Sequence, residues 1–255
     1  MLQLLSTDFD GTLVGHPHNL SCPAEFAELL AAHKRAGGLW AINTGRSLWH
    51  AEEGIEIFAA PVPPDFVLAN EREVFRRAAD GSWEAHGEWN ELCERRHGEF
   101  FERSVGLFGL IERELGAFRG LQLIREGGRP AGLIARNEGQ MEDVVRMLGQ
   151  VAAGEPEFSF QRNTVYLRFC HADYDKGTAL AELCRLEGIA REAVFAAGDH
   201  HNDLPMLRPD LAAALACPAN AIPEVKAAVR AGGGYISAKP TSAGIAEALA
   251  HFLEK

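Results

Sequence analysis

The sequence predicts an α/β protein in which a parallel-sheet core is interrupted by an inserted α+β segment. Short apolar runs alternate with helical patterns at both ends of the 255-residue chain, which is typical of a parallel sheet with helices on both faces. In the middle of the chain, a hairpin signal and short strands replace this alternation. We therefore predict a core from residues 1–74 and 173–255, and an inserted cap domain from residues 75–172.

The first core segment begins with an apolar strand and a helix that Ser21 and Pro23 open and the pair Gly37-Gly38 ends. The predicted elements are strands at residues 2–5, 39–43 and 65–70, with helices at 23–36 and 48–58 between them. This order of strands and helices predicts parallel pairing, because each helix returns the chain to the same end of the sheet.

The inserted segment opens with a hairpin signal, in which Val74-Phe75 and Trp83-Glu84 flank the turn Asp80-Gly81. Further elements are predicted as helices at residues 89–101, 107–115 and 141–151, and strands at 122–124, 132–135 and 164–169. The alternation of the core then returns, with helices at 176–187, 202–207, 222–231 and 242–253 and strands at 193–197, 211–216 and 235–237.

Composition excludes several classes of partner. The formal charge of −11 argues against nucleic acid and anionic membranes, and the chain has no run of about 18 apolar residues that could span a bilayer. The N-terminus shows no secretory signal pattern. The five cysteines have no metal-like spacing, so we expect free thiols in a reducing cytoplasm. These features predict a cytoplasmic protein that acts on small molecules; its oligomeric state stays open.

The segment Ser6-Thr7-Asp8-Phe9-Asp10-Gly11-Thr12-Leu13 is the most informative part of the chain, because two carboxylates follow directly on a buried strand. Alternation along an extended segment places Asp8 and Asp10 on the same side. Two negative charges so close require neutralisation, and Mg²⁺ is the usual partner of such oxygen ligands. Two solvated loop acids are the alternative interpretation.

Other polar groups also fall where predicted strands end or the next helix begins. Ligands of open α/β sheets bind beyond the carboxyl ends of the strands. Each group has a plain alternative: Thr44 could cap a helix, Lys176 could be solvated, and Asp199 could belong to a turn. Lys176 opposes the dipole of the helix it opens, however, and it is one of only five lysines. Together with Asp8, these groups form a consistent phosphate site, which Asn202 and Asp203 extend.

This constellation resembles the haloacid dehalogenase superfamily in the order and spacing of four motifs. They are Asp8-Phe9-Asp10-Gly11-Thr12-Leu13, Thr44-Gly45-Arg46, Lys176-Gly177 and Gly198-Asp199-His200-His201-Asn202-Asp203. The insertion between the second and third motifs is similar to the caps of the Cof-like and sucrose-phosphate phosphatase branches. Downstream, the segment from Asn220 to Lys226 is similar to the Asn-Ala-x-x-Glu-x-Lys segment of those branches. The resemblance implies a Rossmann-like parallel-sheet core with an inserted α+β cap.

Chemistry and the resemblance agree on the roles. Asp8 is expected to be the nucleophile that forms an aspartyl-phosphate, and Asp10 the acid and base that moves protons. Mg²⁺ is expected to be held by Asp8, the backbone carbonyl of Asp10 and Asp199, with Asn202 or Asp203 in support. The phosphate oxygens are expected to be bound by a further set: Thr44, Gly45, Lys176 and Asn202.

The chain departs from the resemblance after its third strand. Cof-like members often have Asn-Gly-Ala there, whereas this chain has Asn70-Glu71-Arg72, so we expect a different local turn. The pair His200-His201 occupies variable positions, and packing is the preferred interpretation over metal binding. Candidate substrate-binding residues are Arg46 and Asn70 in the core and Arg125 and Arg162 in the cap, although any one cap arginine is better explained by a surface role.

The leading hypothesis is a Mg²⁺-dependent phosphatase that hydrolyses a small phosphorylated metabolite, with a sugar phosphate as the preferred substrate class. The resemblance leaves open a phosphomutase of the phosphomannomutase kind, which transfers phosphate between hydroxyls. A signalling receiver domain also uses Asp, Thr and Lys, but it is about half this length and accepts phosphate on a central strand. A non-catalytic sugar-phosphate binder would be expected to lack Asp8 or Asp10, and both are present.

Overall fold

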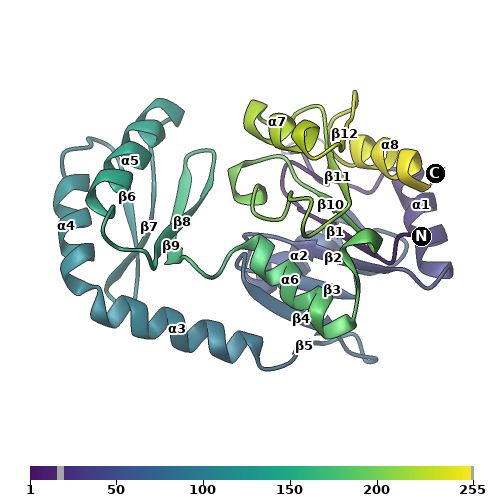
Figure 1. Ribbon diagram of the computed structural model, residues 1–255, viewed down its shortest axis with the longest axis horizontal. Helices are drawn as coiled ribbons and strands as arrows, with labels where there is room; N and C mark the ends of the chain where they lie inside the picture. Colours follow the sequence, from purple (N-terminus) through teal and green to yellow (C-terminus); the bar gives the residue numbers. More distant parts are fainter. Residues whose placement is uncertain (16–19, 254–255) are drawn as a thin grey trace. The chain divides into compact units, whose positions relative to one another are not determined.

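In a computed structural model, which describes residues 1–15 and 20–253, the chain forms two compact units (Figure 1). Unit 1 comprises Met1–Asn90 and Asp175–Lys255, and unit 2 comprises Glu91–Tyr174. The chain therefore has an α/β body interrupted by a second body. The boundaries lie at residues 90/91 and 174/175, whereas the sequence placed them at 74/75 and 172/173.

Unit 1 is built on an eight-stranded sheet of order β12-β11-β10-β1-β2-β3-β4-β5. The strands are β1 (Leu4–Thr7), β2 (Leu39–Asn43), β3 (Phe66–Ala69), β4 (Glu73–Arg77), β5 (Trp83–Ala85), β10 (Val194–Ala197), β11 (Ala214–Cys217) and β12 (Tyr235–Ile236). All pairs from β12 to β3 are parallel. The chain builds the sheet outward from β1 in one direction and later in the other, so the strand order reverses between β1 and β10.

The hairpin predicted for the inserted segment belongs to this sheet. Strand β4 pairs antiparallel with β3, and β5 pairs antiparallel with β4. The sequence signal identified the hairpin correctly but gave no partner for it. Since a two-stranded hairpin is marginally stable alone, its pairing with β3 gives it the support of a large sheet.

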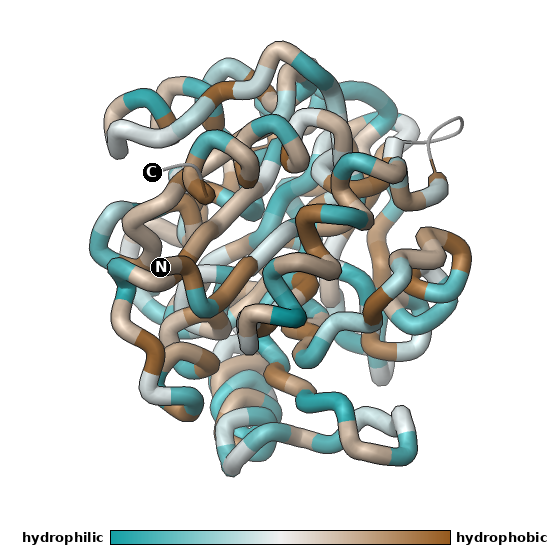
Figure 2. Tube along the Cα trace, turned by 90° about the vertical axis from the view of Figure 1, so that its right-hand side faces the viewer, coloured by the Kyte–Doolittle hydropathy of each residue, from teal (hydrophilic) through white to brown (hydrophobic). Residues whose placement is uncertain are grey.

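Helices cover both faces of the sheet, because alternate residues of its strands point to opposite sides. Leu4 packs in one apolar cluster with residues of α6 (Lys176–Glu187) and α7 (Pro223–Ala231). Leu5 packs in the other with residues of α1 (Ala24–Arg35), α2 (Leu48–Phe58) and α8 (Thr241–Leu253). Brown apolar and teal polar residues alternate along the helices (Figure 2), as expected for helices with one buried face.

Unit 2 is an α+β body with its own core. Its antiparallel sheet has the order β6-β7-β9-β8, and Ile111, Val144 and Leu167 are among its fully buried residues. Its elements are α3 (Trp89–Arg103), which begins at the end of unit 1, α4 (Val105–Leu115), β6 (Gln122–Glu126), β7 (Arg129–Ile134), α5 (Glu138–Val151), β8 (Phe158–Asn163) and β9 (Tyr166–His171).

One strand of unit 2 was absent from the sequence prediction. Strand β8 pairs with β9 along its whole length, with Phe158 opposite His171 and Asn163 opposite Tyr166. Only Phe158 and Phe160 alternate with polar residues in this strand, and only two of its six residues are buried. An edge strand of this kind carries a weak periodic signal.

All five cysteines are free, as the sequence predicted. Cys93, Cys170 and Cys217 are buried, and Cys22 and Cys184 are half-buried. Among the residues that the structure describes, no helix combines the length and apolar character needed to cross a bilayer.

Truncation of a buried side chain of unit 2 is expected to destabilise that unit selectively. Ile111→Ala removes a fully buried side chain of α4 and should cost about 2–5 kcal/mol. Val105→Ala, on the same helix at 67% exposure, is the matched control and should change stability by less than about 0.5 kcal/mol. Hydrogen exchange should accelerate for amides of residues 91–174 only; equal acceleration in unit 1 would contradict two separate cores.

Candidate active site

The candidate site lies at the carboxyl ends of the central parallel strands, on both sides of the reversal in strand order. Asp8 follows β1, and its N–H donates to Ala197 O at the end of β10 over 2.9 Å. Asp199 follows β10, and Thr44 follows β2. The topology thus brings together, at one edge of the sheet, segments from opposite ends of the chain.

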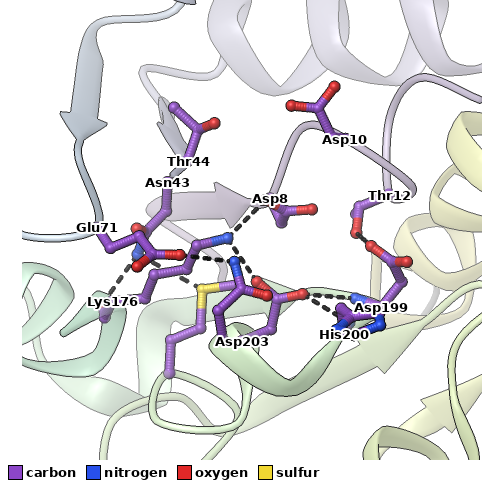
Figure 3. Close-up of polar contacts among 12 residues, drawn as sticks. Asp8, Asp10, Thr12, Asn43, Thr44, Glu71, Lys176, Asp199, His200 and Asp203 are labelled. Atoms are coloured by element: carbon purple, nitrogen blue, oxygen red, sulfur yellow. Dashed lines mark hydrogen bonds and ion pairs between the residues drawn. The ribbon is translucent and has the colours of Figure 1, made fainter. Parts of the chain in front are cut away.

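A buried lysine joins two of the carboxylates. Lys176 Nζ lies 2.6 Å from Asp8 Oδ1 and 2.6 Å from Asp203 Oδ1, and the lysine side chain is fully buried (Figure 3). Burial alone lowers the pKa of Lys176, but the charges of Asp203 and Asp8 outweigh this effect and raise it well above its usual value. Lys176 is therefore a permanent cation at the centre of the site.

The local sequence around Lys176 fixes its position. Asp175 caps helix α6 by accepting the N–H of Thr178 over 2.8 Å, and Thr178 Oγ1 accepts the N–H of Asp175 over 2.9 Å. The amide of Asn43, at the end of β2, donates to the carbonyl of Lys176 over 2.9 Å. The ammonium group therefore extends from a backbone that is held on both sides.

Asp203 organises the loop after β10. Its Oδ2 accepts the N–H groups of Asp199 and His200 over 2.8 and 2.9 Å, while Oδ1 faces Lys176. A Cβ at Gly198 would lie 2.4 Å from the Cβ of Asp203, so only glycine permits this turn. Because both of its oxygens accept hydrogen bonds, Asp203 mainly orients Asp199 and Lys176.

A hydroxyl group contacts Asp199, the third carboxylate of the site. Asp199 accepts a hydrogen bond from Thr12 Oγ1 over 2.9 Å. Burial, followed by the charge of Asp203, raises the pKa of Asp199 to about 7. Burial and Asp203 also raise the pKa of Asp8, against the opposing effect of Lys176. Three ionised carboxylates would outnumber the one ammonium group, so the site without a further cation favours protonation of Asp8 and Asp199.

This donor set fits a hard divalent cation. Asp8, Asp199 and Asp203 each offer an oxygen, and these three atoms lie within 4.8 Å of one another. In addition, Asn202 Oδ1 is buried without a hydrogen-bond partner among the described residues. Carboxylate and amide oxygens are the ligands that such cations prefer, and a cation would supply the missing positive charge. Asp10 is not part of this cluster through its side chain.

The Asp10 carboxylate instead lies against Arg46, and Figure 3 shows it apart from Asp8. Arg46 Nε and Nη2 donate to its two oxygens over 2.7 and 2.6 Å. The guanidinium also lies 4.9 Å from the ring centre of Phe9, and it donates to His50 O over 3.1 Å. A Cβ at Gly54 would come within 2.4 Å of this guanidinium, so the glycine in α2 makes room for it.

Comparisons with known proteins bear on this arrangement. Residues 133–249 match the family model of the haloacid dehalogenase-like hydrolases, a range that includes Lys176, the loop 198–203 and the segment 220–226. The resemblance predicted from the motifs is thereby confirmed over these residues, although Asp8 and Thr44 lie outside the matched range.

Solved structures of these hydrolases share the fold over the whole chain. The sucrose-phosphatase of Synechocystis sp. PCC6803, solved with sucrose and phosphate, is 20% identical with a TM-score of 0.69, covering 99% of this chain and 98% of that one. A haloacid dehalogenase-like hydrolase of B. subtilis is 14% identical with a TM-score of 0.69, covering 98% and 99%. The phosphatase BT1666 of Bacteroides thetaiotaomicron is 20% identical with a TM-score of 0.62, covering 99% and 95%. No curated protein matches the chain in sequence.

The predicted site residues divide into two groups. The structure brings Asp8, Thr44, Lys176, Asp199 and Asp203 to the same edge of the sheet (Figure 3). Arg125 and Arg162 lie in unit 2 on β6 and β8, the opposite edges of its sheet. Arg125 pairs with Glu112 and Arg162 with Glu142, the latter over 2.7 Å. These two arginines therefore do not form one binding surface within unit 2.

Other predicted residues make contacts that the motifs did not specify. Thr44 Oγ1 accepts the N–H of Arg46 over 3.1 Å, and Asn70 Nδ2 donates to Glu73 over 2.9 Å. The rings of His200 and His201 contact each other at 4.9 Å between centres, and neither belongs to the carboxylate cluster of the described residues.

Sequence reasoning missed four residues that build the site. Thr12 holds Asp199, Asn43 holds the Lys176 backbone, and Glu71 accepts the amide of Asn202 over 2.8 Å. Asn220 donates to Gly11 O over 2.7 Å and accepts the N–H of Thr241 over 2.9 Å. Thr12 and Asn220 lie in the sequence motifs described above, and Asn43 directly precedes Thr44-Gly45. Their positions relative to the predicted strand ends were the signal that could have identified these residues.

The raised pKa of Asp199 predicts how stability depends on pH without metal. Because the folded state keeps a proton that the unfolded state loses, the free energy of unfolding should fall as pH rises from about 4 to about 7. Asp199→Asn should reduce this fall. Urea unfolding in EDTA at pH 5 and pH 8 measures it, with exposed Asp80→Asn as the control. An equal fall in wild type and Asp199→Asn would contradict the assignment.

Proposed function

We propose that this protein is a Mg²⁺-dependent phosphatase that acts on a small phosphate ester through an aspartyl-phosphate intermediate. The observation that carries the proposal is the buried ion-pair system in which Lys176 lies 2.6 Å from both Asp8 and Asp203. A cation next to a strand-end carboxylate and beside two further carboxylates is suited to phosphoryl transfer, because positive charge stabilises the transferring group.

Asp8 is the proposed nucleophile. Lys176 holds its Oδ1, which leaves the other oxygen to form a bond with phosphorus as the bond to the leaving oxygen breaks. Water then attacks phosphorus, the bond to Asp8 breaks, and phosphate leaves. The hydrolysis is thereby divided into two steps of lower barrier.

Asp10 is the proposed acid and base. It protonates the leaving oxygen in the first step and removes a proton from water in the second. Since both of its oxygens contact Arg46, this role requires that at least one oxygen leaves the guanidinium when substrate binds. Arg46 is thus placed to respond to the substrate as well as to Asp10.

The cation site is proposed to hold Mg²⁺. Asp8 and Asp199 would hold it with the backbone carbonyl of Asp10, while Asp203 positions Asp199. When bound, the ion supplies positive charge that offsets the carboxylates and the phosphoryl oxygens. Thr44, Gly45 and Lys176 would bind the phosphoryl oxygens from the other side of Asp8.

We also propose that unit 2 is the cap that selects the substrate, and that the substrate is a sugar phosphate. The fold shared with the sucrose-phosphatase supports the choice of substrate class. Five free thiols fit a reducing cytoplasm as the place of action.

Release of inorganic phosphate from a panel of sugar and polyol phosphates tests the activity. Turnover should require Mg²⁺, stop on addition of EDTA and return with excess Mg²⁺, because the carboxylates of the site need a counter-charge. Turnover that EDTA leaves unchanged would contradict the cation. Interconversion of isomeric hexose phosphates without release of phosphate would favour a mutase instead.

Asp8→Asn should abolish turnover while the protein remains folded. Asparagine keeps the shape and an oxygen acceptor for Lys176 but is a poor nucleophile, so kcat should fall by at least about 10³-fold. Circular dichroism and thermal unfolding check the fold, and Asp80→Asn is the control for loss of one carboxylate. Mass spectrometry of wild type quenched during turnover should find a phosphoryl group on Asp8. Full activity of Asp8→Asn would refute the mechanism.

A further inference from the structure

The turn between β3 and β4 contains two residues in the left-handed region. Asn70 has φ 51° and Glu71 has φ 65°. Glycine adopts this conformation without a steric penalty, asparagine tolerates it, and glutamate is disfavoured there. Backbone hydrogen bonds hold this turn against the loop Thr44-Gly45-Arg46. The Glu71 N–H donates to Thr44 O over 2.9 Å, and the Asn70 N–H donates to Arg46 O over 2.8 Å. A glutamate at this strained position indicates a use for its side chain.

The Glu71 carboxylate lies among the groups proposed to bind phosphate. The residue is 7% exposed, and its Oε1 accepts the amide N–H of Asn202 over 2.8 Å. A Cβ at Gly45 would lie 3.1 Å from the same oxygen, so the carboxylate packs on the Thr44-Gly45 turn. Figure 3 shows it on the side of Lys176, and its charge contributes to the raised pKa of that lysine after Asp203 and Asp8.

Two consequences for an anion follow from this position. The Asn202 amide has two N–H donors, and the one that donates to Glu71 does not donate to a phosphate oxygen at the same time. The carboxylate also adds negative charge beside Thr44 and Lys176, and like charges placed together in a site weaken binding. Both effects reduce the affinity for phosphate without removing any group that performs the chemistry.

We propose that Glu71 is a positioning residue that weakens the binding of free phosphate, by holding the Asn202 amide and by placing negative charge beside Lys176. This inference rests on the proposed function. Its consequence is fast release of the product phosphate and weak inhibition by it. The residue acts through Asn202 and through the field at the site.

Two variants separate the two effects. Glu71→Gln removes the charge but keeps an oxygen that can accept from Asn202, so the Kd of inorganic phosphate should fall by about tenfold. Glu71→Gly also frees the Asn202 amide and suits the left-handed backbone, so Kd should fall further. In the double variant Glu71→Gly with Asn202→Ala, that additional gain should disappear. Glu73→Gln, a carboxylate on the same turn that pairs with Asn70, is the control and should leave Kd unchanged.

The measurement is calorimetric titration of each full-length protein with inorganic phosphate in saturating Mg²⁺, together with the phosphate inhibition constant during ester hydrolysis. The inhibition constant should fall in parallel with Kd, and thermal unfolding verifies that each variant is folded. If the wild type hydrolyses esters but the Kd of phosphate changes by less than twofold in both Glu71 variants, the role of Glu71 is overturned and the proposed function is not. Failure of wild type and variants alike to hydrolyse esters or to bind phosphate would overturn the proposed function and this inference with it.

Discussion

The structure of the site depends on one buried cation. The ammonium group of Lys176 joins the end of β1, through Asp8, to the loop after β10, through Asp203, and it does so with no exposure to solvent. A buried lysine without partners would lose its charge or destabilise the fold. Here the carboxylates keep it charged, and in turn it keeps them close together. Removal of Lys176 would leave Asp8 and Asp203 without the cation that they share.

The surrounding fold makes this interaction possible. Alternation in the central strands divides the apolar residues between two faces, so helices cover the sheet while the strand ends stay polar. Asp8 and Asp199 follow neighbouring strands at the reversal of strand order, where ligands of open α/β sheets bind. Close approaches at Gly198 and Gly54 then admit the Asp203 and Arg46 side chains, so small residues set the dimensions of the site.

Much of this could be read from the sequence, because parallel strands, their helices and the polar groups at strand ends all leave local signals. Strand β2 and helix α2 have the predicted bounds. Other features depend on contacts between distant segments. No sequence pattern identifies the partner of the β4–β5 hairpin or the edge strand β8. The same holds for two side-chain pairs, Arg46–Asp10 and Glu71–Asn202. The sequence shows that Glu71 stands where Cof-like members often have glycine. Only the three-dimensional structure shows where its carboxylate lies.

The pairing of β1 with β10 also affects how the chain folds during synthesis. Leu4 pairs with Val194, so one edge of β1 stays unpaired until a strand that is distant in the sequence has been synthesised. At typical rates of translation this delay is about 10–40 s. During that time β1 exposes unpaired N–H and C=O groups next to buried apolar residues, which is a template for aggregation. The arrangement that brings the two halves of the site together thus gives the nascent chain an open sheet edge until β10 has been synthesised.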